Sequence, residues 1–526
     1  MTDAWSIDAG KLLRRGAQRN PGKVAVIWED GARTYGELLR RVDRLSAGLA
    51  ARGVQRGDRV GVLFQNGPHF LEVWWAVAQM GAIVVPLSTR ALPHDFVYVL
   101  NDAQAVAVLA DAEFLPTLLD IRREVPSLRL LVGQGAPLPE VVPFEALADG
   151  PAVAPPAVDL ALPDPCAIYY TAGTTGVSKG AVRSHLSVTW GLALLAARIP
   201  PSEIYLARAP MYHTGGSLTG PFATLAAGAT LVSMRHFDAR ALLSAVERYR
   251  LTRIYVHPTL VANALLDEMA RHRYDLSSLR YIQWTAGPLP EAVRARLLDA
   301  FPGLPFEVTY GMTEVSNIAS YEYTGGPLKA ASCVGLGPVG TAVRIVDEDG
   351  QPAPAEQVGE VAVRSPTAMT EYWRDPERTA TVLTAGWVHT GDLGFLDEDG
   401  YLHLAGRQKD SIKTGGETVH AVEVENALAS LPAVLEAAVV GLPDATWGEA
   451  VTAIVVPRSG AALTPATVIA HCRERLPGYK CPKRVLFVDS LPKNSVGKVQ
   501  KVELVRRHGD PSALSALPGG GGDGRG

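Results

Sequence analysis

Short apolar runs alternate with amphipathic runs over the first hundred residues, and this rhythm restricts the fold more than any other feature of the chain. Apolar runs at residues 23–28, 59–63, 82–87 and 105–110 have the length and composition of buried strands. Helical patterns separate them, and Thr34 with Glu37 forms a capping box ahead of the first helix. Repeated strand–helix alternation is typical of parallel sheets covered by helices, so we predict an α/β fold.

The same rhythm resumes after residue 201 and then changes character. Strands are predicted near residues 229–234, 253–256 and 281–284, whereas 137–165 is rich in proline and alanine and is interpreted as a connection within the large domain. Residues 29–32 are predicted to form a turn. Residues 334–401 contain short strands and Gly/Asp turns, which favours a small β-rich subdomain. A compact α/β piece of about a hundred residues follows and has the size of a separate small domain.

Composition excludes some classes of partner. The chain has 526 residues, a net charge of −4 and 20% charged residues, without a basic stripe, so no nucleic-acid partner is expected. The most apolar window is interrupted by Gln79, Gly81 and Pro86, so no stable membrane insertion is expected. The four cysteines have no metal-ligand spacing and are predicted to be buried and reduced. No secretory leader is evident at the N-terminus, and a cytoplasmic location is expected.

A loop rich in glycine and threonine follows the apolar run at residues 166–170. Residues 171–180 read TAGTTGVSKG, which combines flexible backbone amides, hydroxyl donors and a lysine. It is not a conventional P-loop, because Ser178 and Gly180 stand where that motif requires glycine and Ser or Thr. By composition alone, the segment is either a phosphate-binding loop or an ordinary surface turn.

Four further motifs decide between these alternatives. They occur in a fixed order along the chain: PMYHTGG at 210–216, TYGMTE at 309–314, HTGDLG at 389–394 followed by GR at 406–407, and PKNSVGK at 492–498. Together with the loop, they resemble the adenylate-forming superfamily of acyl-CoA synthetases, luciferases and peptide-synthetase adenylation domains. The resemblance covers residues from about 20 to about 503. It implies a large N-terminal domain of mostly parallel sheets with a β-rich subdomain, followed by a small mobile C-terminal α/β domain.

The resemblance implies a site for ATP and Mg²⁺. The phosphates would be bound by Thr171, Thr174, Thr175 and Lys179. The nucleotide would also contact Tyr310, Thr313, Asp392 and Arg407, with the Tyr310 ring against adenine and the Asp392 carboxylate on the ribose hydroxyls. Glu314, with Thr174, would hold the metal, because Mg²⁺ takes few protein carboxylates and fills its other positions with phosphate and water. Each of these residues also has an ordinary structural interpretation: a core tyrosine, a turn-forming aspartate or a surface arginine.

Catalysis and domain movement are also implied by the resemblance. Lys498 would reach the α-phosphate and the substrate carboxylate together, and His213 would lie where the acid pocket meets the thiol tunnel. The C-terminal domain would swing about a hinge at Lys409 and bring Gly415 and Gly416 to the site for reaction with coenzyme A. The domains are therefore predicted at 1–406 and 411–506, with the hinge at 407–410 and a disordered tail at 507–526.

The second substrate and the acid remain open at this stage. The motif at 210–216 resembles the acyl- and aryl-CoA ligase branch, so we predict an acid–CoA ligase. The alternatives are an enzyme that transfers the acyl group to a carrier protein or an amine, and a nucleotide-binding homologue without catalysis. The acid pocket is predicted to draw on His213, Thr214, Gly215, Thr285, Ala286, Gly287 and Met312, for a fatty or aromatic acid. Ala172 and Ser178 depart from the family loop, which usually has serine and proline there, so altered ATP affinity is expected.

Overall fold

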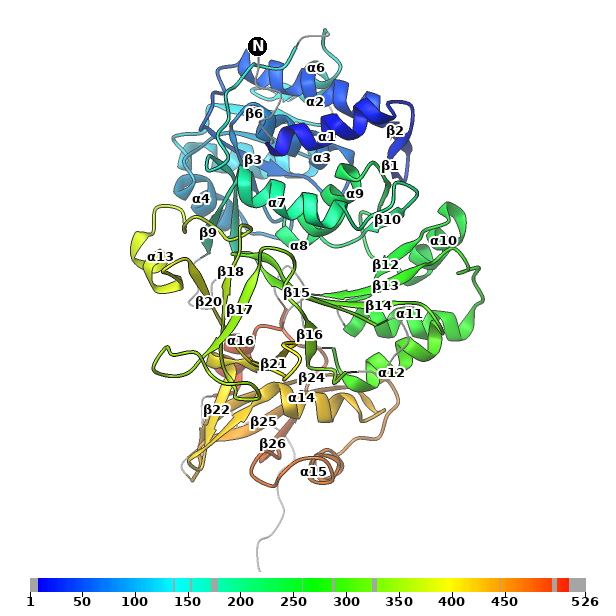
Figure 1. Ribbon diagram of the computed structural model, residues 1–526, viewed down its shortest axis with the longest axis vertical. Helices are drawn as coiled ribbons and strands as arrows, with labels where there is room; N and C mark the ends of the chain where they lie inside the picture. Colours follow the sequence, from blue (N-terminus) through cyan, green and yellow to red (C-terminus); the bar gives the residue numbers. More distant parts are fainter. Residues whose placement is uncertain are drawn as a thin grey trace, which may run out of the picture.

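The structure is a computed structural model that describes residues 8–135, 138–151, 154–171, 178–257, 259–285, 289–323, 329–444, 446–493 and 499–509. It contains two large sheets, a smaller antiparallel sheet and a separate C-terminal domain with its own sheet. Figure 1 shows these parts stacked along the long axis, with the N-terminal sheets above and the C-terminal domain below. No helix within these ranges is both long enough and apolar enough to cross a membrane.

The first large sheet has seven strands and is parallel except at one edge. Its order is β7 (Val142–Pro143), β6 (Leu130–Gly133), β5 (Ala105–Ala110), β3 (Arg59–Leu63), β4 (Ile83–Pro86), β8 (Pro165–Thr171) and β9 (Lys179–Ser184). Only β8 and β9 pair antiparallel, with Thr171 opposite Lys179. The loop predicted to bind phosphate therefore connects two neighbouring strands, and both of its described ends are fixed by the sheet.

The second large sheet has eight strands and is likewise parallel in its centre. Its order is β15 (Ser316–Tyr323), β14 (Phe306–Met312), β13 (Tyr281–Thr285), β12 (Arg253–Tyr255), β10 (Ile204–Ala207), β11 (Thr230–Ser233), β1 (Val24–Trp28) and β2 (Gly31–Thr34). The edge strands β15 and β2 pair antiparallel with their neighbours. The carboxyl ends of β12, β13 and β14 lie side by side because these strands pair in parallel register.

Helices fill the space between the two large sheets. They are α1 (Ala9–Arg19), α2 (Tyr35–Ala50), α3 (Pro68–Gln79), α7 (His185–Ala196) and α9 (Ala223–Ala226). Helix α3 is buried on almost every side, and its Trp74 and Trp75 are fully enclosed. One hydrophobic core includes residues of β3 and of β11, so it joins both sheets into a single unit.

Further helices cover the outer faces of the two sheets. On the first sheet they are α4 (Pro93–Asp102) and α5 (Leu115–Ile121), and on the second α10 (Ala239–Tyr249), α11 (Thr259–Arg271) and α12 (Glu291–Ala300). Helix α6 (Phe144–Ala148) packs instead against α2 and belongs to the core shared by both sheets. Helices on both faces explain why the central strands read as continuous apolar runs in the sequence.

The β-rich subdomain is an antiparallel sheet next to the second large sheet. Its strands are β16 (Cys333–Gly335), β21 (Leu402–Arg407), β20 (Trp387–Leu396), β18 (Gly359–Arg364) and β17 (Ala342–Val346), with β19 (Leu383–Thr384) added to β20 and α13 (Pro376–Val382) leading into it. Strand β21 ends at Arg407 and is followed directly by the short helix η4 (Gln408–Asp410), which leads into the C-terminal domain.

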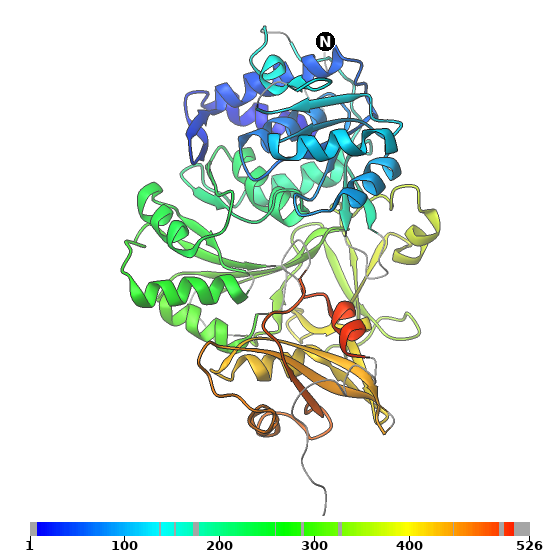
Figure 2. The same cartoon turned by 180° about the vertical axis from the view of Figure 1, so that it is seen from behind.

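The C-terminal domain is a mixed sheet with helices against it. Its strands are β23 (Glu417–His420), β22 (Ser411–Thr414), β25 (Gly448–Pro457), β24 (Val434–Asp444) and β26 (Arg484–Phe487), and its helices are α14 (Ala421–Ala429), α15 (Pro465–Arg473) and α16 (Lys501–His508). Thr464 caps α15, with Pro465 in its first turn. Seen from behind in Figure 2, α16, drawn in red, lies above the sheet of this domain, toward the N-terminal part.

The structure confirms the predicted α/β class and corrects some details. Mostly parallel sheets, the antiparallel subdomain and the separate C-terminal domain are all present, and all four cysteines are buried and unpaired. Residues 29–32 are not only a turn, because β2 begins at Gly31 and forms a hairpin with β1. The connection at 137–165 contains β7 and α6, and α16 continues to His508, two residues beyond the predicted domain end at 506.

Candidate functional site

The predicted site residues gather where several strands end. Thr171 is the last residue of β8 and Lys179 the first of β9, while Thr285 and Met312 close β13 and β14. Strand β10 leads to His213, which precedes the short helix α8 (Thr214–Ser217) that contains Thr214 and Gly215. Parallel strands place their carboxyl ends at one edge of the sheet, and ligands of α/β proteins bind at such edges.

Three of the predicted nucleotide contacts form one hydrogen-bonded group. The Tyr310 hydroxyl donates to Asp392 Oδ2 at 2.6 Å, and Arg407 Nε lies 2.8 Å from Asp392 Oδ1. Tyr310 and Asp392 are 9% and 6% exposed, although they lie 82 residues apart in the chain. Burial, and secondarily the negative charge of Asp392, raises the pKa of Tyr310 well above its ordinary value. Tyr310 therefore remains a neutral donor, which keeps the carboxylate oriented.

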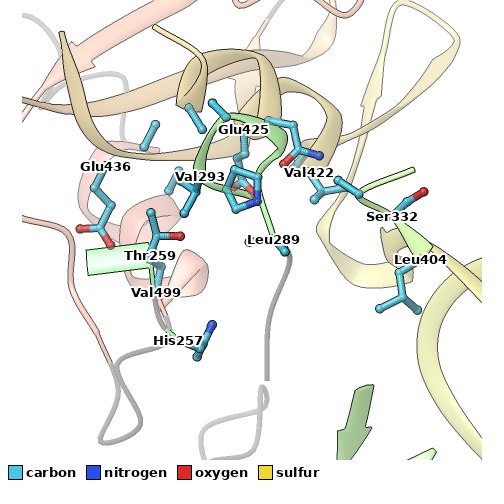
Figure 3. Close-up of a pocket in the computed structure, with 18 of the residues that line it drawn as sticks. His257, Thr259, Leu289, Val293, Ser332, Leu404, Val422, Glu425, Glu436 and Val499 are labelled. Carbon is cyan, nitrogen blue, oxygen red and sulfur yellow. The ribbon is translucent and has the colours of Figure 1, made fainter. Parts of the chain in front are cut away.

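This group opens onto a cavity of about 610 Å³ between the N-terminal part and the C-terminal domain. Figure 3 shows His257, Leu289 and Val293 facing the cavity together with Val422, Glu425, Glu436 and Val499 of the C-terminal domain. The lining also includes Lys501, which forms an ion pair with Glu425 at 2.7 Å. Both parts of the chain thus contribute walls to one cavity.

Glu314 and Lys179 lie close to the same tyrosine. Glu314 is 8% exposed, and its Oε1 accepts a hydrogen bond of 2.7 Å from the Tyr372 hydroxyl. The Lys179 ammonium lies 5.4 Å from the centre of the Tyr372 ring. Burial is the main cause of a lowered pKa at Lys179, and the Glu314 charge opposes that shift. The tyrosine was not identified from the sequence, since no local motif marks it.

The backbone before Glu314 is held by a buried arginine that was also not identified. Arg183 in β9 is fully buried and donates to the carbonyl oxygen of Thr313 at 2.8 Å. Burial lowers its pKa to about 10. The sequence did show a charged residue, Arg183, within the strand at 179–184. That pattern does not identify a buried arginine, because a charged residue is equally common in an exposed edge strand.

His213 is enclosed beside Tyr212, whose ring centre lies 4.4 Å from its own. Its Nε2 has no hydrogen-bond partner among the residues that the structure describes. Burial lowers the pKa of His213 to about 4. The imidazole is therefore neutral at physiological pH, and its Nε2 is a polar atom without a charge.

We expect His213 to destabilise the fold as the solution is acidified. Its pKa is about 4 in the folded protein and about 6.5 when unfolded, so the unfolded chain binds more protons between these values. The free energy of unfolding should therefore fall from about pH 6.5 to pH 4. Chemical denaturation across this range should show a shallower fall for His213→Gln, by about one proton. Equal pH slopes for the variant and the parent protein would contradict the assignment.

Some predicted site residues are not part of this group. Gly415 and Gly416 form the turn of the β22–β23 hairpin, with φ of +57° and +84°, and neither lines the cavity. In Figure 1 this hairpin lies at the lower left, below β14 and β20. A side chain at Gly415 would begin 3.0 Å from the Trp447 ring, so the turn there admits only glycine without adjustment. Lys409 lies within η4, where burial lowers its pKa.

Several predicted residues lie outside the described ranges. They are Ala172, Thr174 and Thr175 of the loop, Ala286 and Gly287 of the acid pocket, and Lys498.

Comparison with known proteins shows the class of protein that this fold and site define. Residues 13–373 match the family model of the AMP-binding enzyme, and residues 423–498 match that of the AMP-binding enzyme C-terminal domain. The chain belongs to the AMP-binding enzyme family, in agreement with the resemblance drawn from the five motifs.

Individual relatives cover nearly the whole chain. A feruloyl-CoA synthase from Amycolatopsis sp. is 37% identical over 497 residues, which are 94% of this chain and 98% of the relative. The crystal structure of an anthranilate CoA ligase in complex with anthranoyl-AMP has a TM-score of 0.88 and 27% identity, covering 98% of this chain and 100% of that one. The amide bond synthetase McbA from Marinactinospora thermotolerans has a TM-score of 0.84 and 31% identity, covering 95% and 99%.

Proposed function

We propose that the protein is an ATP-dependent carboxylate–CoA ligase that forms an acyl-adenylate and then an acyl-CoA. The single observation that carries this proposal is the hydrogen-bonded group of Tyr310, Asp392 and Arg407 beside a cavity lined by both domains. In the first half-reaction the acid attacks the α-phosphate of ATP and releases pyrophosphate. In the second, the thiol of CoA takes the acyl group and releases AMP.

Nucleotide binding uses residues of β8, β9, β14, β20 and β21 in this proposal. Thr171, Thr174, Thr175 and Lys179 bind the β- and γ-phosphates, with Thr313 nearby. The Asp392 carboxylate accepts hydrogen bonds from the ribose hydroxyls, while its contacts with Tyr310 and Arg407 fix its direction. The Tyr310 ring lies beside the cavity, and its flat face suits contact with a planar base.

Glu314 is suited to a magnesium ion brought in with the nucleotide. Among the described residues there is no cluster of three or more His, Cys, Asp or Glu side chains that could hold a metal alone. A single buried carboxylate with one oxygen hydrogen-bonded to Tyr372 fits Mg²⁺, which takes most of its ligands from phosphate and water. When bound, the ion neutralises phosphate charge. Glu314 would hold it, together with Thr174.

The carboxylate of the acid is itself the nucleophile, so no general base is required. Crowding of negative charge at the α-phosphate is the main barrier, and a lysine ammonium that meets both reacting groups lowers it. Lys498 takes this role in the proposal. It is bonded to Val499, a residue that lines the cavity. Neutral His213 either hydrogen-bonds the substrate carboxylate or controls the entry of the thiol in this proposal.

The second half-reaction requires a different arrangement of the domains. We propose domains at 1–406 and 411–506 with the hinge at 407–410. Val499 and Lys501 face the cavity, whereas Gly415 and Gly416 do not, and this supports an orientation suited to adenylation. Rotation about Lys409 would exchange the two segments and bring the glycine turn to the thiol.

The acid is proposed to be aromatic. His257 packs edge-on against the buried Trp284, with ring centres 5.0 Å apart, at the end of the pocket strands. Tyr212 and His213 add a second aromatic pair. Flat walls of this kind favour a planar ring, and the feruloyl and anthranilate ligases are relatives whose names carry such acids. The location proposed is the cytoplasm, where ATP and CoA are both supplied.

An acceptor comparison tests the function. Purified protein with ATP and Mg²⁺ is supplied with a panel of aromatic and fatty acids and with CoA, a carrier protein or an amine. We expect acid-dependent pyrophosphate release and rapid thioester formation with CoA for at least one aryl acid. Preferential amide formation would favour the alternative that the amide bond synthetase represents. No acid-dependent pyrophosphate release would overturn the ligase proposal.

A further inference from the structure

We propose that Tyr372 and Arg183 are positioning residues that set the Glu314 carboxylate in the orientation in which it binds the Mg²⁺ of MgATP. This inference rests on the proposed function, which assigns the metal to Glu314. Neither residue belongs to the five motifs. Both act through contacts with the turn at Thr313 and Glu314.

The segment that carries Tyr372 pairs with the strand that leaves the phosphate loop. Val182 N donates to the Glu371 carbonyl at 2.9 Å, Thr370 N to the Val182 carbonyl at 3.0 Å, and Trp373 N to the Gly180 carbonyl at 2.7 Å. Ala181 and Tyr372 form an antiparallel bridge. Residues 369–373, here called the clamp segment, therefore lie beside β9 as a short additional strand.

The clamp segment holds Glu314 at two points. Met369 N donates to the Glu314 carbonyl at 2.6 Å, and the Tyr372 hydroxyl donates to the Glu314 carboxylate at 2.7 Å. Tyr372 is 3% exposed, so water does not compete for this bond. A neutral donor to one oxygen orients the carboxylate and leaves its negative charge in place, which is the form a cation requires.

Tyr372 also contacts the phosphate-binding lysine. The ring face lies under the Lys179 ammonium, while the hydroxyl at its edge reaches Glu314. No ion pair joins Lys179 to Glu314 in the described part of the chain. The phenol thus faces the lysine with its ring and bonds the carboxylate with its hydroxyl, and the lysine remains available to phosphate and the carboxylate to the metal.

Arg183 joins the remaining sides of this arrangement. Its guanidinium donates to the carbonyls of Thr313 and Thr367, which precede Glu314 and the clamp segment respectively. It also donates to Ser187 Oγ at 3.2 Å, and no carboxylate of the described residues lies within ion-pair distance. A buried cation with only neutral partners is costly. The guanidinium nevertheless links two turns, because it donates hydrogen bonds to the carbonyl oxygens of Thr313 and Thr367. Two carbonyl oxygens cannot bond to each other without such a donor between them.

The experiment compares Tyr372→Phe with the parent protein. The variant keeps the ring under Lys179 and removes only the donor to Glu314. We expect the Mg²⁺ concentration for half-maximal ATP–pyrophosphate exchange to rise roughly tenfold, with the rate at saturating Mg²⁺ changed less than threefold. Binding of Mn²⁺ in the presence of a non-hydrolysable ATP analogue, measured by electron paramagnetic resonance, should weaken by a similar factor.

Two further variants separate positioning from simple loss of stability. Tyr35→Phe removes another fully buried hydroxyl, which donates to the carbonyls of Leu225 and Ala229 in the core. It should lower the unfolding temperature without shifting the metal titration. Arg183→Lys keeps a charge but loses the forked geometry, and it should weaken metal binding in the same direction as Tyr372→Phe.

The outcomes distinguish this inference from the function on which it rests. Glu314→Gln should weaken Mn²⁺ binding more than Tyr372→Phe does. If Glu314→Gln weakens it and Tyr372→Phe matches the parent protein, Tyr372 does not position the carboxylate and the inference fails alone. If Glu314→Gln has no effect on metal binding, the assignment of the metal to Glu314 is wrong and the inference falls with it.

Discussion

Replacing Lys498 by alanine is expected to lower acid-dependent ATP–pyrophosphate exchange by about 100- to 1,000-fold. The ammonium would meet charge that is greatest in the transition state, so its loss should reduce the maximal rate more than the affinity for ATP. Thioester formation from a supplied acyl-adenylate should remain largely intact, because the phosphoryl step has already occurred. Rapid-quench measurement of each half-reaction separately checks both statements.

A matched lysine in the same segment provides the control. Lys493 pairs with Glu436 at 2.8 Å on the C-terminal domain, and its backbone forms a bridge with Val499. Lys493→Ala should change both half-reactions by less than about threefold, since exposed and half-buried ion pairs contribute little. Equal losses in both half-reactions for Lys498→Ala would refute a role confined to adenylation.

Replacing Lys409 by proline is expected to have the opposite effect, with adenylation retained and thioester formation reduced by 100-fold or so. Proline fixes φ and restricts the residue before it, so the backbone at Gln408 and residue 409 could not rotate freely. Domain rearrangement is needed only for the second half-reaction in the proposed mechanism. Single-turnover formation of acyl-AMP and of acyl-CoA should separate the two effects.

The alanine variant at the same position separates backbone from side chain. Lys409→Ala removes the ammonium and leaves the backbone free, so it should retain more of the second half-reaction than Lys409→Pro. A proline variant with a normal rate of thioester formation would exclude residue 409 as the hinge. Similar losses for alanine and proline would assign the effect to the charge.

Local patterns predicted much of the fold because they reflect local causes. Strands β3 and β5 begin and end where their apolar runs do, and Thr34 caps α2 through the predicted box with Glu37. Helix α1 was missed because the segment is polar on average and its buried face consists mainly of small residues such as Ala9, Gly10 and Ala17. Strand β2 was missed because an edge strand of four residues resembles a turn.

The site was predictable where one motif supplies one contact, and less so where contacts come from distant segments. Asp392 and Tyr310 were both identified from their motifs, although their mutual hydrogen bond required the fold. Tyr372 could not be found in this way, because its partner Glu314 lies 58 residues earlier and the bond depends on the clamp segment pairing with β9. Arg183 was ambiguous, since the sequence does not reveal whether a charged strand residue faces water or the core.

Arg407 has one further consequence for how the enzyme would be controlled. It is the last residue of β21, it contacts Asp392, and it is joined directly to η4. A change of backbone direction at the proposed hinge would therefore act on a proposed nucleotide contact. Thermodynamic reciprocity then applies: a nucleotide state that favours one domain orientation is bound more tightly in that orientation by the same factor. Because ATP and AMP carry the same ribose, a nucleotide-dependent bias of the proposed swing would have to arise from the phosphates rather than from Asp392 itself.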